Sequence, residues 1–239
     1  MHLPLTKYGL PQVVVFPLLV FILMVVLFLF LRPLCILLPV EVLLLLALVW
    51  MLSFFRDPSR TVVPDETVLY SPADGTITDI TVVEDSALGL PALRIGMFLS
   101  IFNVHINRAP CSVCIENVTY KKGRFKNAMS PESSRVNESN DILMTRLSAP
   151  NDRLLVRQIS GAIARHIVCA ARQGAEYRQG EPFGMIKFGS RTELYLDAAG
   201  QSGGGSGNSR PDYRGKYQVT VKIGDRVRAG LTPLVRYFP

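Results

Sequence analysis

The segment Gly174-Ala-Glu-Tyr-Arg-Gln-Gly180 has a counterpart near the C-terminus, Gly224-Asp-Arg-Val-Arg-Ala-Gly230. Both segments begin and end with glycine, and both contain an acidic residue, an apolar residue and then an arginine. Glycine adopts positive φ angles without steric cost, which tight turns between strands often require. The repeated pattern therefore predicts two glycine-bounded turns that join short strands of one β-rich domain.

Short runs rich in β-branched and aromatic residues continue on both sides of these turns. The predicted strands are Thr67–Tyr70, Thr76–Val83, Ala92–Asn103, Ile115–Tyr120, Asp141–Leu147, Leu154–Gln158, Ala162–Ala170, Phe183–Phe188 and Tyr217–Ile223. Many short strands at this spacing are typical of a sandwich or barrel rather than of alternating β–α units. The predicted fold class is mainly β, with a compact β-sandwich or barrel-sandwich-like domain over residues 56–239. The turn pattern is similar to turns of lipoyl and biotinyl domains, a likeness that concerns the fold alone.

An almost continuous apolar stretch fills most of residues 1–55 and forms the expected membrane anchor. One helix needs about 20 apolar residues to cross a bilayer. The stretch therefore predicts a transmembrane hairpin of two helices, Gln12–Leu31 and Leu34–Phe55, that turns at Arg32-Pro33. It is too long for a cleaved signal peptide. The alternative is a hairpin that enters the bilayer without crossing it, because Glu41 shortens the second apolar run.

The charge of the chain favours a lipid surface as its partner. The formal net charge is +7 and the pI is about 9.4. The basic residues are spread out and no nucleic-acid motif accompanies them, so we expect anionic headgroups and no nucleic acid. Lys7, Arg56 and Arg60 flank the hairpin, against Arg32 at its turn. Cytoplasmic loops carry more Lys and Arg, which predicts that the β-rich domain lies on the cytoplasmic face. The expected membrane is a bacterial-type inner membrane.

The cysteines do not predict a metal site. Cys111 and Cys114 have the C-x-x-C spacing of zinc and redox motifs. No second pair and no paired histidines complete a four-ligand zinc site, and the context of a thioredoxin-like motif is missing. We interpret the two cysteines as small residues on a strand.

A low-complexity segment precedes the last hairpin of the domain. It contains Gly200-Gln-Ser-Gly-Gly-Gly-Ser-Gly-Asn-Ser209. Glycine- and serine-rich sequences are typical of flexible linkers. We therefore expect a flexible surface loop at about residues 197–215, with no chemistry of its own.

Three short patches contain the residues best suited to catalysis. Ser71-Pro-Ala-Asp74-Gly75 places an acidic residue in a tight turn, which alone is common. Phe102-Asn-Val-His105-Ile-Asn-Arg-Ala-Pro110 sets a histidine in a polar cluster after an apolar strand, although a lone histidine is more often structural. Gly184-Met-Ile-Lys-Phe-Gly-Ser-Arg-Thr-Glu193 contains Gly189-Ser190, which alone indicates a turn between strands.

Together the patches resemble the short, pyruvoyl-dependent form of the phosphatidylserine decarboxylase family. The likeness covers most of the chain and rests on the order and spacing of several motifs. These motifs are Phe54-Phe-Arg-Asp-Pro58, Ser71-Pro-Ala-Asp-Gly75, Asn103-Val-His-Ile-Asn-Arg-Ala-Pro110, Gly123-Arg-Phe-Lys-Asn-Ala128, Asn137-Glu-Ser-Asn140, Arg157-Gln-Ile-Ser-Gly161 and Phe188-Gly-Ser-Arg191.

The resemblance implies that the chain is a proenzyme that cuts itself. In this family cleavage occurs at Gly-Ser, here between Gly189 and Ser190, and the serine becomes an N-terminal pyruvoyl group. A serine hydroxyl is a weak nucleophile until a base takes its proton. His105 is the implied base, and Asp74 would orient its imidazole as in Ser-His-Asp triads.

The resemblance also implies the substrate, the cofactor and the partners. The substrate would be phosphatidylserine in the membrane and the product phosphatidylethanolamine, with the pyruvoyl group as cofactor and no metal. Chains 1–189 and 190–239 would stay associated, and a homo-oligomer is compatible with the sequence. Candidates for holding the substrate phosphate or carboxylate are Arg108, Arg191, Lys187 and, more weakly, Asn103. Solvated surface charge is an equally good interpretation of the three basic residues.

The chain departs from the family pattern beside His105. Long-form relatives carry a second histidine three residues earlier, where this chain has Phe102. His105 could therefore serve both self-cleavage and decarboxylation. His166 stands where relatives are expected to have an arginine, and we interpret it as structural.

Two alternative functions stay open at this point. A non-enzymatic barrel-sandwich adaptor on a membrane hairpin would explain the turns and the anchor. It would leave Asp74, His105 and Gly189-Ser190 without a role. A decarboxylase of another serine phospholipid, such as an ether-linked one, would use the same headgroup chemistry.

Overall fold

The chain divides into two compact units, Met1–Ser59 and Arg60–Pro239. The computed structural model describes residues 5–31, 33–84, 88, 91–130, 132–162, 166–187, 189–198 and 217–238. The glycine- and serine-rich segment expected to form a flexible loop lies outside the described residues, apart from its first two positions.

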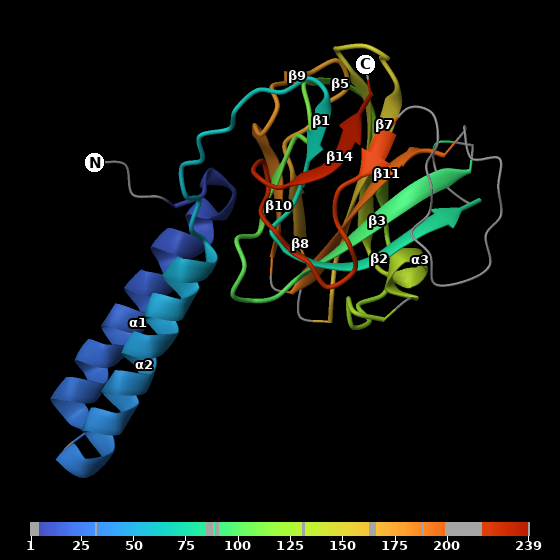
Figure 1. Cartoon of the computed structure of the whole chain (residues 1–239). Coiled ribbons are helices and arrows are strands. Elements are labelled where there is room, and N and C mark those ends of the chain that lie inside the picture. Colours follow the sequence, from blue (N-terminus) through green and yellow to red (C-terminus); the bar gives the residue numbers. More distant parts are fainter. Residues whose placement is uncertain are drawn as a thin grey trace. The chain divides into compact units, whose positions relative to one another are not determined.

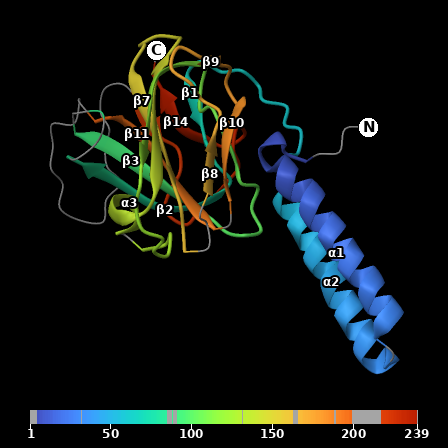
Figure 2. The same ribbon diagram turned by 180° about the vertical axis from the view of Figure 1, so that it is seen from behind.

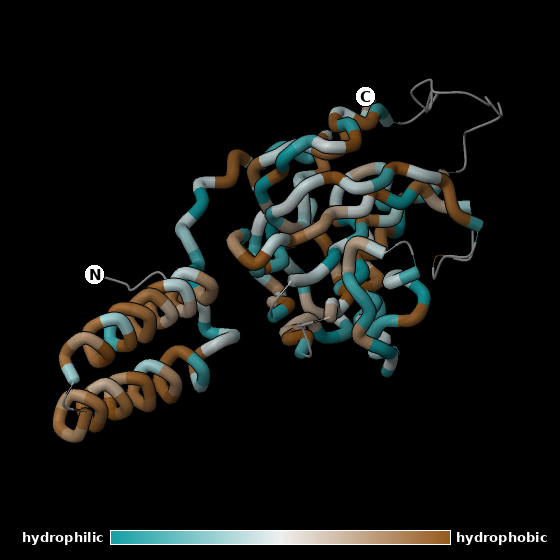
Figure 3. The backbone as a smooth tube through the Cα atoms, turned by 90° about the horizontal axis from the view of Figure 1, so that it is seen from below, coloured by the Kyte–Doolittle hydropathy of each residue, from teal (hydrophilic) through white to brown (hydrophobic). Residues whose placement is uncertain are grey.

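The first unit is a helical hairpin. It consists of a short 3-10 helix, η1 (Lys7–Gly9), and two long helices, α1 (Leu10–Phe30) and α2 (Leu34–Phe54). The long helices lie side by side and are apolar along most of their length (Figures 1 and 3). At the open end of the hairpin, the Thr6 N–H donates to the Phe55 carbonyl at 2.9 Å. Both helices are long and apolar enough to cross a membrane, and their ends lie within about two residues of the predicted bounds.

The second unit is built from strands that form three antiparallel sheets. The strands are β1 (Val68–Tyr70), β2 (Gly75–Val83), β3 (Ala92–Leu99), β4 (Ile106–Arg108), β5 (Val113–Lys121), β6 (Ser139–Arg146), β7 (Arg153–Ile159), β8 (His166–Cys169), β9 (Glu176–Tyr177), β10 (Pro182–Lys187), β11 (Ser190–Asp197), β12 (Tyr217–Val219), β13 (Arg226–Val227) and β14 (Pro233–Tyr237). The largest sheet has the order β13-β2-β3-β11-β7-β6-β5-β9. The smaller sheets are β4-β10-β8 and β1-β14-β12. The predicted mainly β fold class is confirmed, with one short helix, α3 (Ser133–Val136), among the described residues of this unit.

The core lies between the largest sheet and the two smaller ones. Successive side chains of a strand point to opposite faces of a sheet. On β11, Leu194 and Leu196 belong to the main apolar core, together with Phe183 of β10 and Leu234 of β14. Figure 2 shows β10 and β8 side by side, from the side opposite to Figure 1. The alternate residues Arg191, Glu193 and Tyr195 point to the other face of the largest sheet.

The glycine-bounded segments form turns, as their sequence predicts. Their end glycines have φ values of 79°, 78°, 93° and 72° at Gly174, Gly180, Gly224 and Gly230. Each segment also contains a two-residue strand, β9 or β13, that pairs with an outer strand of the largest sheet, which the pattern did not predict. The predicted strand Ala92–Asn103 is too long, because β3 ends at Leu99 and a hydrogen-bonded turn follows.

Candidate active site

Asp74 and Ser190 lie at the same edge of the largest sheet. Strand β3 separates β2 from β11, and it runs antiparallel to both. Its last residue, Leu99, pairs with Ser190 at the start of β11. Asp74 directly precedes β2, and the next residue, Gly75, packs against the Phe98 carbonyl. The ladder therefore brings two segments more than a hundred positions apart in the sequence to one edge.

His105 is held by the turn that follows β3. Asn103 closes this turn, because its side-chain oxygen accepts from the Ser100 N–H at 2.8 Å. The imidazole Nδ1 lies 2.9 Å from the Asn103 carbonyl oxygen, and the side chain is fully buried. The His105 carbonyl accepts from the Ile186 N–H of β10. The turn thus fixes the imidazole at the point where β4 begins.

A buried polar bridge links the segment that carries His105 to the strand that carries Ser190. Asn107 donates to Thr192 Oγ1 at 3.0 Å and accepts from Gln158 Nε2 at 2.8 Å. Asn107 also pairs with Gly184 of β10, and Gly184 packs against Gln158 of β7. His105 precedes Asn107 by two residues, and Ser190 precedes Thr192 by two. Residues two apart on a strand share a face, so Ser190 faces the interior like Thr192, while His105 is fully buried directly before β4.

The Asp74 carboxylate binds Arg60 rather than the histidine Nδ1. Its oxygens accept from Arg60 Nη1 and Nη2 at 2.6 and 2.8 Å, and one of them also accepts from the Ala229 N–H at 2.7 Å. The predicted orientation of His105 by Asp74 is therefore replaced by the hydrogen bond between the imidazole and a main-chain carbonyl. In the sequence, Arg60 stands out only as one of the basic residues that flank the hairpin, and no spacing pattern links it to Asp74.

The Gly189–Ser190 peptide lies in an unusual conformation and a close-packed environment. Gly189 has φ 65°, in the left-handed region that favours glycine. A Cβ on Gly161 would overlap the Gly189 carbonyl oxygen. Ser190 is fully buried, and its Oγ has no hydrogen-bond partner within the part of the chain that the structure describes. A glycine that fits this left-handed φ, followed by a buried hydroxyl with no competing partner among the described residues, suits a backbone cleavage site.

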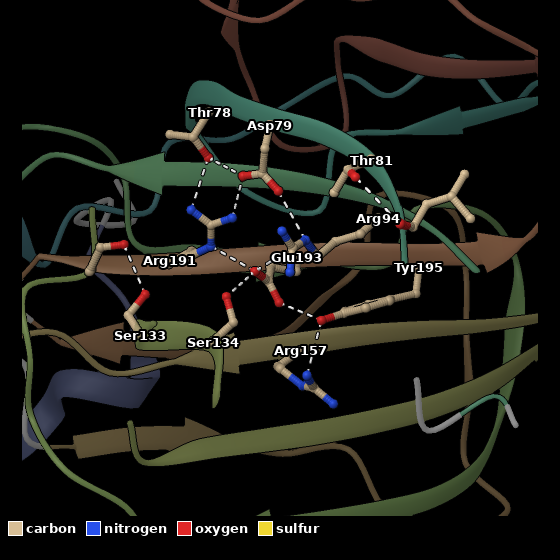
Figure 4. A network of polar contacts seen from close by, with 12 residues as sticks. Thr78, Asp79, Thr81, Arg94, Ser133, Ser134, Arg157, Arg191, Glu193 and Tyr195 are labelled. Atoms are coloured by element: carbon tan, nitrogen blue, oxygen red, sulfur yellow. Dashed lines mark hydrogen bonds and ion pairs between the residues drawn. The ribbon is translucent and has the colours of Figure 1, made fainter. Parts of the chain in front are cut away.

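Arg191 belongs to a different site from Ser190, because neighbouring strand residues point to opposite faces. Its guanidinium donates to Thr78 Oγ1 at 3.0 Å, to Glu193 at 2.7 Å and to Asp79 (Figure 4). Burial opposes the charge, but the two carboxylates outweigh this effect and raise the Arg191 pKa. These contacts hold Arg191 within the fold, and substrate binding by Arg191 stays a prediction.

The same network extends across the outer face of the largest sheet. Glu193 accepts from Ser134 Oγ and from the Tyr195 hydroxyl, each at 2.6 Å (Figure 4). Arg157 donates to the Tyr195 hydroxyl at 3.0 Å and makes a two-point ion pair with Asp141 at 2.5 and 2.9 Å. Burial alone would raise the Asp141 pKa, but the Arg157 guanidinium holds that pKa below its usual value. The network ties β11 to β6 and to α3.

Of the other candidates for substrate binding, Arg108 and Lys187 are buried and Asn103 is half-buried. Arg108 donates to the Gly180 carbonyl at 3.1 Å, at the end of a glycine-bounded turn. Lys187 ends β10, and burial lowers its pKa. Asn103 is engaged with Ser100 in the turn before the histidine. Substrate binding by Arg108, Lys187 and Asn103 stays a prediction.

The C-x-x-C cysteines lie at the start of β5. Cys111 is buried just before this strand, Cys114 is on it, and both are free thiols. Burial raises the pKa of the Cys111 thiol to about 12. Among the described residues, no group of three or more His, Cys, Asp and Glu side chains is arranged to hold a metal ion.

Comparison with known proteins assigns the chain to a family. The sequence model of phosphatidylserine decarboxylase matches residues 48–234. A phosphatidylserine decarboxylase proenzyme of Rhodopirellula baltica is 37% identical over 238 residues, which cover 98% of this chain and 89% of that protein. A proenzyme of the same name from Carboxydothermus hydrogenoformans is 39% identical over 192 residues, which cover 80% of this chain and 81% of that protein.

Proposed function

The chain belongs to the phosphatidylserine decarboxylase family and is a decarboxylase, and we propose that it gains its activity by cutting itself between Gly189 and Ser190. The main support for this proposal is the environment of the Ser190 hydroxyl. Its hydroxyl is buried and has no hydrogen-bond partner among the described residues, and the glycine before it has a left-handed φ. The name proenzyme, which the relatives carry, is consistent with a processed precursor.

The cut begins with attack of Ser190 Oγ on the Gly189 carbonyl carbon. His105 takes the hydroxyl proton as the C–O bond forms. The C–N bond then breaks, the nitrogen of residue 190 receives a proton, and Gly189 is left as an ester on the serine oxygen. Loss of the α-proton of residue 190 expels the Gly189 carboxylate and leaves a double bond at residue 190. Tautomerisation and hydrolysis by one water release ammonia and leave the ketone of a pyruvoyl group.

Asp74 completes the proposed set of residues that processing requires. Its carboxylate is bound by Arg60 and by the Ala229 N–H. We assign it the task of fixing the start of β2 beside the end of β3, where Ser190 is paired. In this proposal Asp74 is a positioning residue, and the main-chain carbonyl of Asn103 orients the His105 imidazole.

The surroundings of residue 190 fit a pyruvoyl group. Residue 190 faces a buried interior that contains the polar side chains of Asn107 and Thr192. A pyruvoyl group in this place would supply an electrophilic carbonyl that withdraws electrons as carbon dioxide leaves an amino acid headgroup. The fully buried His105 is the proposed donor of the proton that replaces the carboxylate. In this proposal one histidine serves both steps, since residue 102 is a phenylalanine.

The position of β11 explains how the two proposed chains would stay together. After the cut, residues 190–239 would begin with β11, which pairs with β3 on one side and with β7 on the other. Release of this chain would break both ladders of a central strand. The proposed product is therefore a tight complex of chains 1–189 and 190–239.

The proposed substrate is phosphatidylserine within a membrane. The two apolar helices are consistent with membrane association, and a two-chain lipid stays in the bilayer. From the basic residues that flank the hairpin, we place the catalytic unit on the cytoplasmic face of a bacterial inner membrane. An ether-linked serine phospholipid is the second candidate substrate, because its headgroup is the same.

Carbon dioxide release tests this proposal. The full-length protein and the Ser190→Ala variant are reconstituted in nanodiscs that contain carboxyl-labelled phosphatidylserine, in diacyl or ether-linked form. We expect the wild-type protein to release labelled carbon dioxide and Ser190→Ala to remain uncut and inactive. Normal release by Ser190→Ala would show that residue 190 does not supply the reactive group.

A further inference from the structure

Ser160 lies directly across from Ser190 at the end of the β7–β11 ladder. The last registered pair of this ladder is Arg191 with Ile159. One step further along an antiparallel pair, Ser190 is opposite Ser160 and Gly189 is opposite Gly161. The contact between Gly161 and the Gly189 carbonyl shows that the two segments remain in close approach past the end of the ladder.

The two serines share the inner face of the sheet. Gln158 and Thr192 are a registered pair, and both are hydrogen-bonded to Asn107 in the interior. Ser160 follows Gln158 by two residues, and Ser190 precedes Thr192 by two. Residues two apart on a strand point to the same side, so the Ser160 and Ser190 side chains face the same interior space.

Both hydroxyls lack a hydrogen-bond partner in the part of the chain that is described, and both residues are fully buried. A buried hydroxyl without a partner is unfavourable, which makes a pair of them side by side unusual. The Cβ atoms of directly opposed residues lie about 4.5–5.5 Å apart. A change of χ1 between staggered rotamers would therefore bring the two oxygens within hydrogen-bond distance.

We infer that Ser160 is a positioning residue for the cut: its hydroxyl donates a hydrogen bond to Ser190 Oγ. This inference rests on the proposed self-cleavage. A bond donated by Ser160 selects the Ser190 rotamer and leaves the Ser190 proton available to His105. The remaining lone pair of Ser190 Oγ is then free to attack the Gly189 carbonyl carbon. No covalent bond to Ser160 forms or breaks.

The test follows the rate of cleavage rather than decarboxylation. Full-length wild-type, Ser160→Ala, Ser160→Thr and Ser139→Ala chains are made by cell-free synthesis in the presence of lipid nanodiscs. Appearance of the chain 190–239 is measured in a pulse-chase experiment, and thermal midpoints are measured in parallel. Ser139 is the matched control, because it is a buried serine that pairs with Ile159 and therefore belongs to the opposite face.

We expect Ser160→Ala to be cut on the order of tenfold more slowly than the wild type, because one hydrogen bond to the nucleophile is lost. Ser160→Thr retains the hydroxyl and should stay within about threefold of the wild type. Ser139→Ala should be cut at the wild-type rate, and both alanine variants should have similar thermal midpoints.

Three results separate the inference from its premise. A wild-type cleavage rate in Ser160→Ala would overturn the role of Ser160 and leave self-cleavage intact. Equal slowing in Ser160→Ala and Ser160→Thr, with a lower thermal midpoint than that of Ser139→Ala, would also overturn it, since packing would then be the cause. Absence of any cut in the wild-type chain would instead contradict the proposed function.

Discussion

The carbonyl oxygen of Gly189 packs against the α-carbon of Gly161, in the space that a side chain at position 161 would occupy. This carbonyl belongs to the peptide bond that we propose is cut. Glycine at both positions lets the two backbones approach closely, while the left-handed φ of Gly189 turns the chain into β11. The position of the reacting carbonyl thus depends on a residue 28 positions earlier in the sequence.

Gly161→Ala should slow self-cleavage by at least about tenfold. The added methyl group must push the Gly189 carbonyl away, and overpacking of this kind costs about 1–3 kcal/mol of stability. Pulse-chase cleavage and thermal unfolding measure the two effects. Gly174→Ala is the control: the positive φ of Gly174 makes alanine strained there, but nothing lies within 4 Å of an added Cβ. Equal cleavage rates in the two variants would show that the contact with Gly161 does not matter.

His105→Gln should reduce the rate of self-cleavage by a factor of about 10²–10⁴, the usual contribution of a general base. Glutamine retains a polar side chain but cannot take the serine proton. His166→Gln is the matched control, because His166 is exposed on β8. The measurement is the fraction of the chain that is cut with time. If His105→Gln were processed as fast as His166→Gln, another group would have to act as the base.

Arg60 and Asp74 should behave as a single unit in a double-mutant cycle. Their two-point ion pair is nearly buried, with side-chain exposures of 6% and 10%. Removal of one partner leaves the other charge unpaired, which costs about 3–5 kcal/mol in buried pairs. We expect Arg60→Gln, Asp74→Asn and the double variant to show similar losses of processing and of unfolding free energy. Additive losses would contradict a direct coupling.

The Asp141–Arg157 pair should make stability depend on acidity. The folded-state pKa of Asp141 is below its ordinary value of 3.8, so the pair stabilises the fold fully above that value. This contribution is lost as the pH falls through the lower folded-state pKa. Asp141→Asn should therefore unfold more easily than the wild type at pH 7, by about 3 kcal/mol. Denaturant unfolding at pH 7 and pH 3 should show a smaller difference at the lower pH. A constant difference would exclude titration of Asp141 as the cause.

The sequence predicts the elements of this protein better than the contacts between them. The apolar run of the hairpin and the glycine-bounded turns have strong local signals, so their positions were predicted closely. Arg191 is a substrate-binding candidate in the sequence because a guanidinium can hold a phosphate or carboxylate, but strand alternation turns it to the other face, where Asp79 and Glu193 bind it. Arg60 and Ser160 carry no local signal, since their neighbours Asp74 and Ser190 are brought to them only by the fold.

The central claim is that the Gly189–Ser190 bond is broken by the protein itself, and the intact mass of the purified full-length protein tests it most directly. Under denaturing conditions we predict two chains, residues 1–189 and 190–239. The smaller chain should be lighter than its sequence by the mass of one ammonia molecule, because the serine has become a pyruvoyl group. Ser190→Ala should give one uncut chain. A single intact wild-type chain that still releases carbon dioxide from phosphatidylserine would contradict the account.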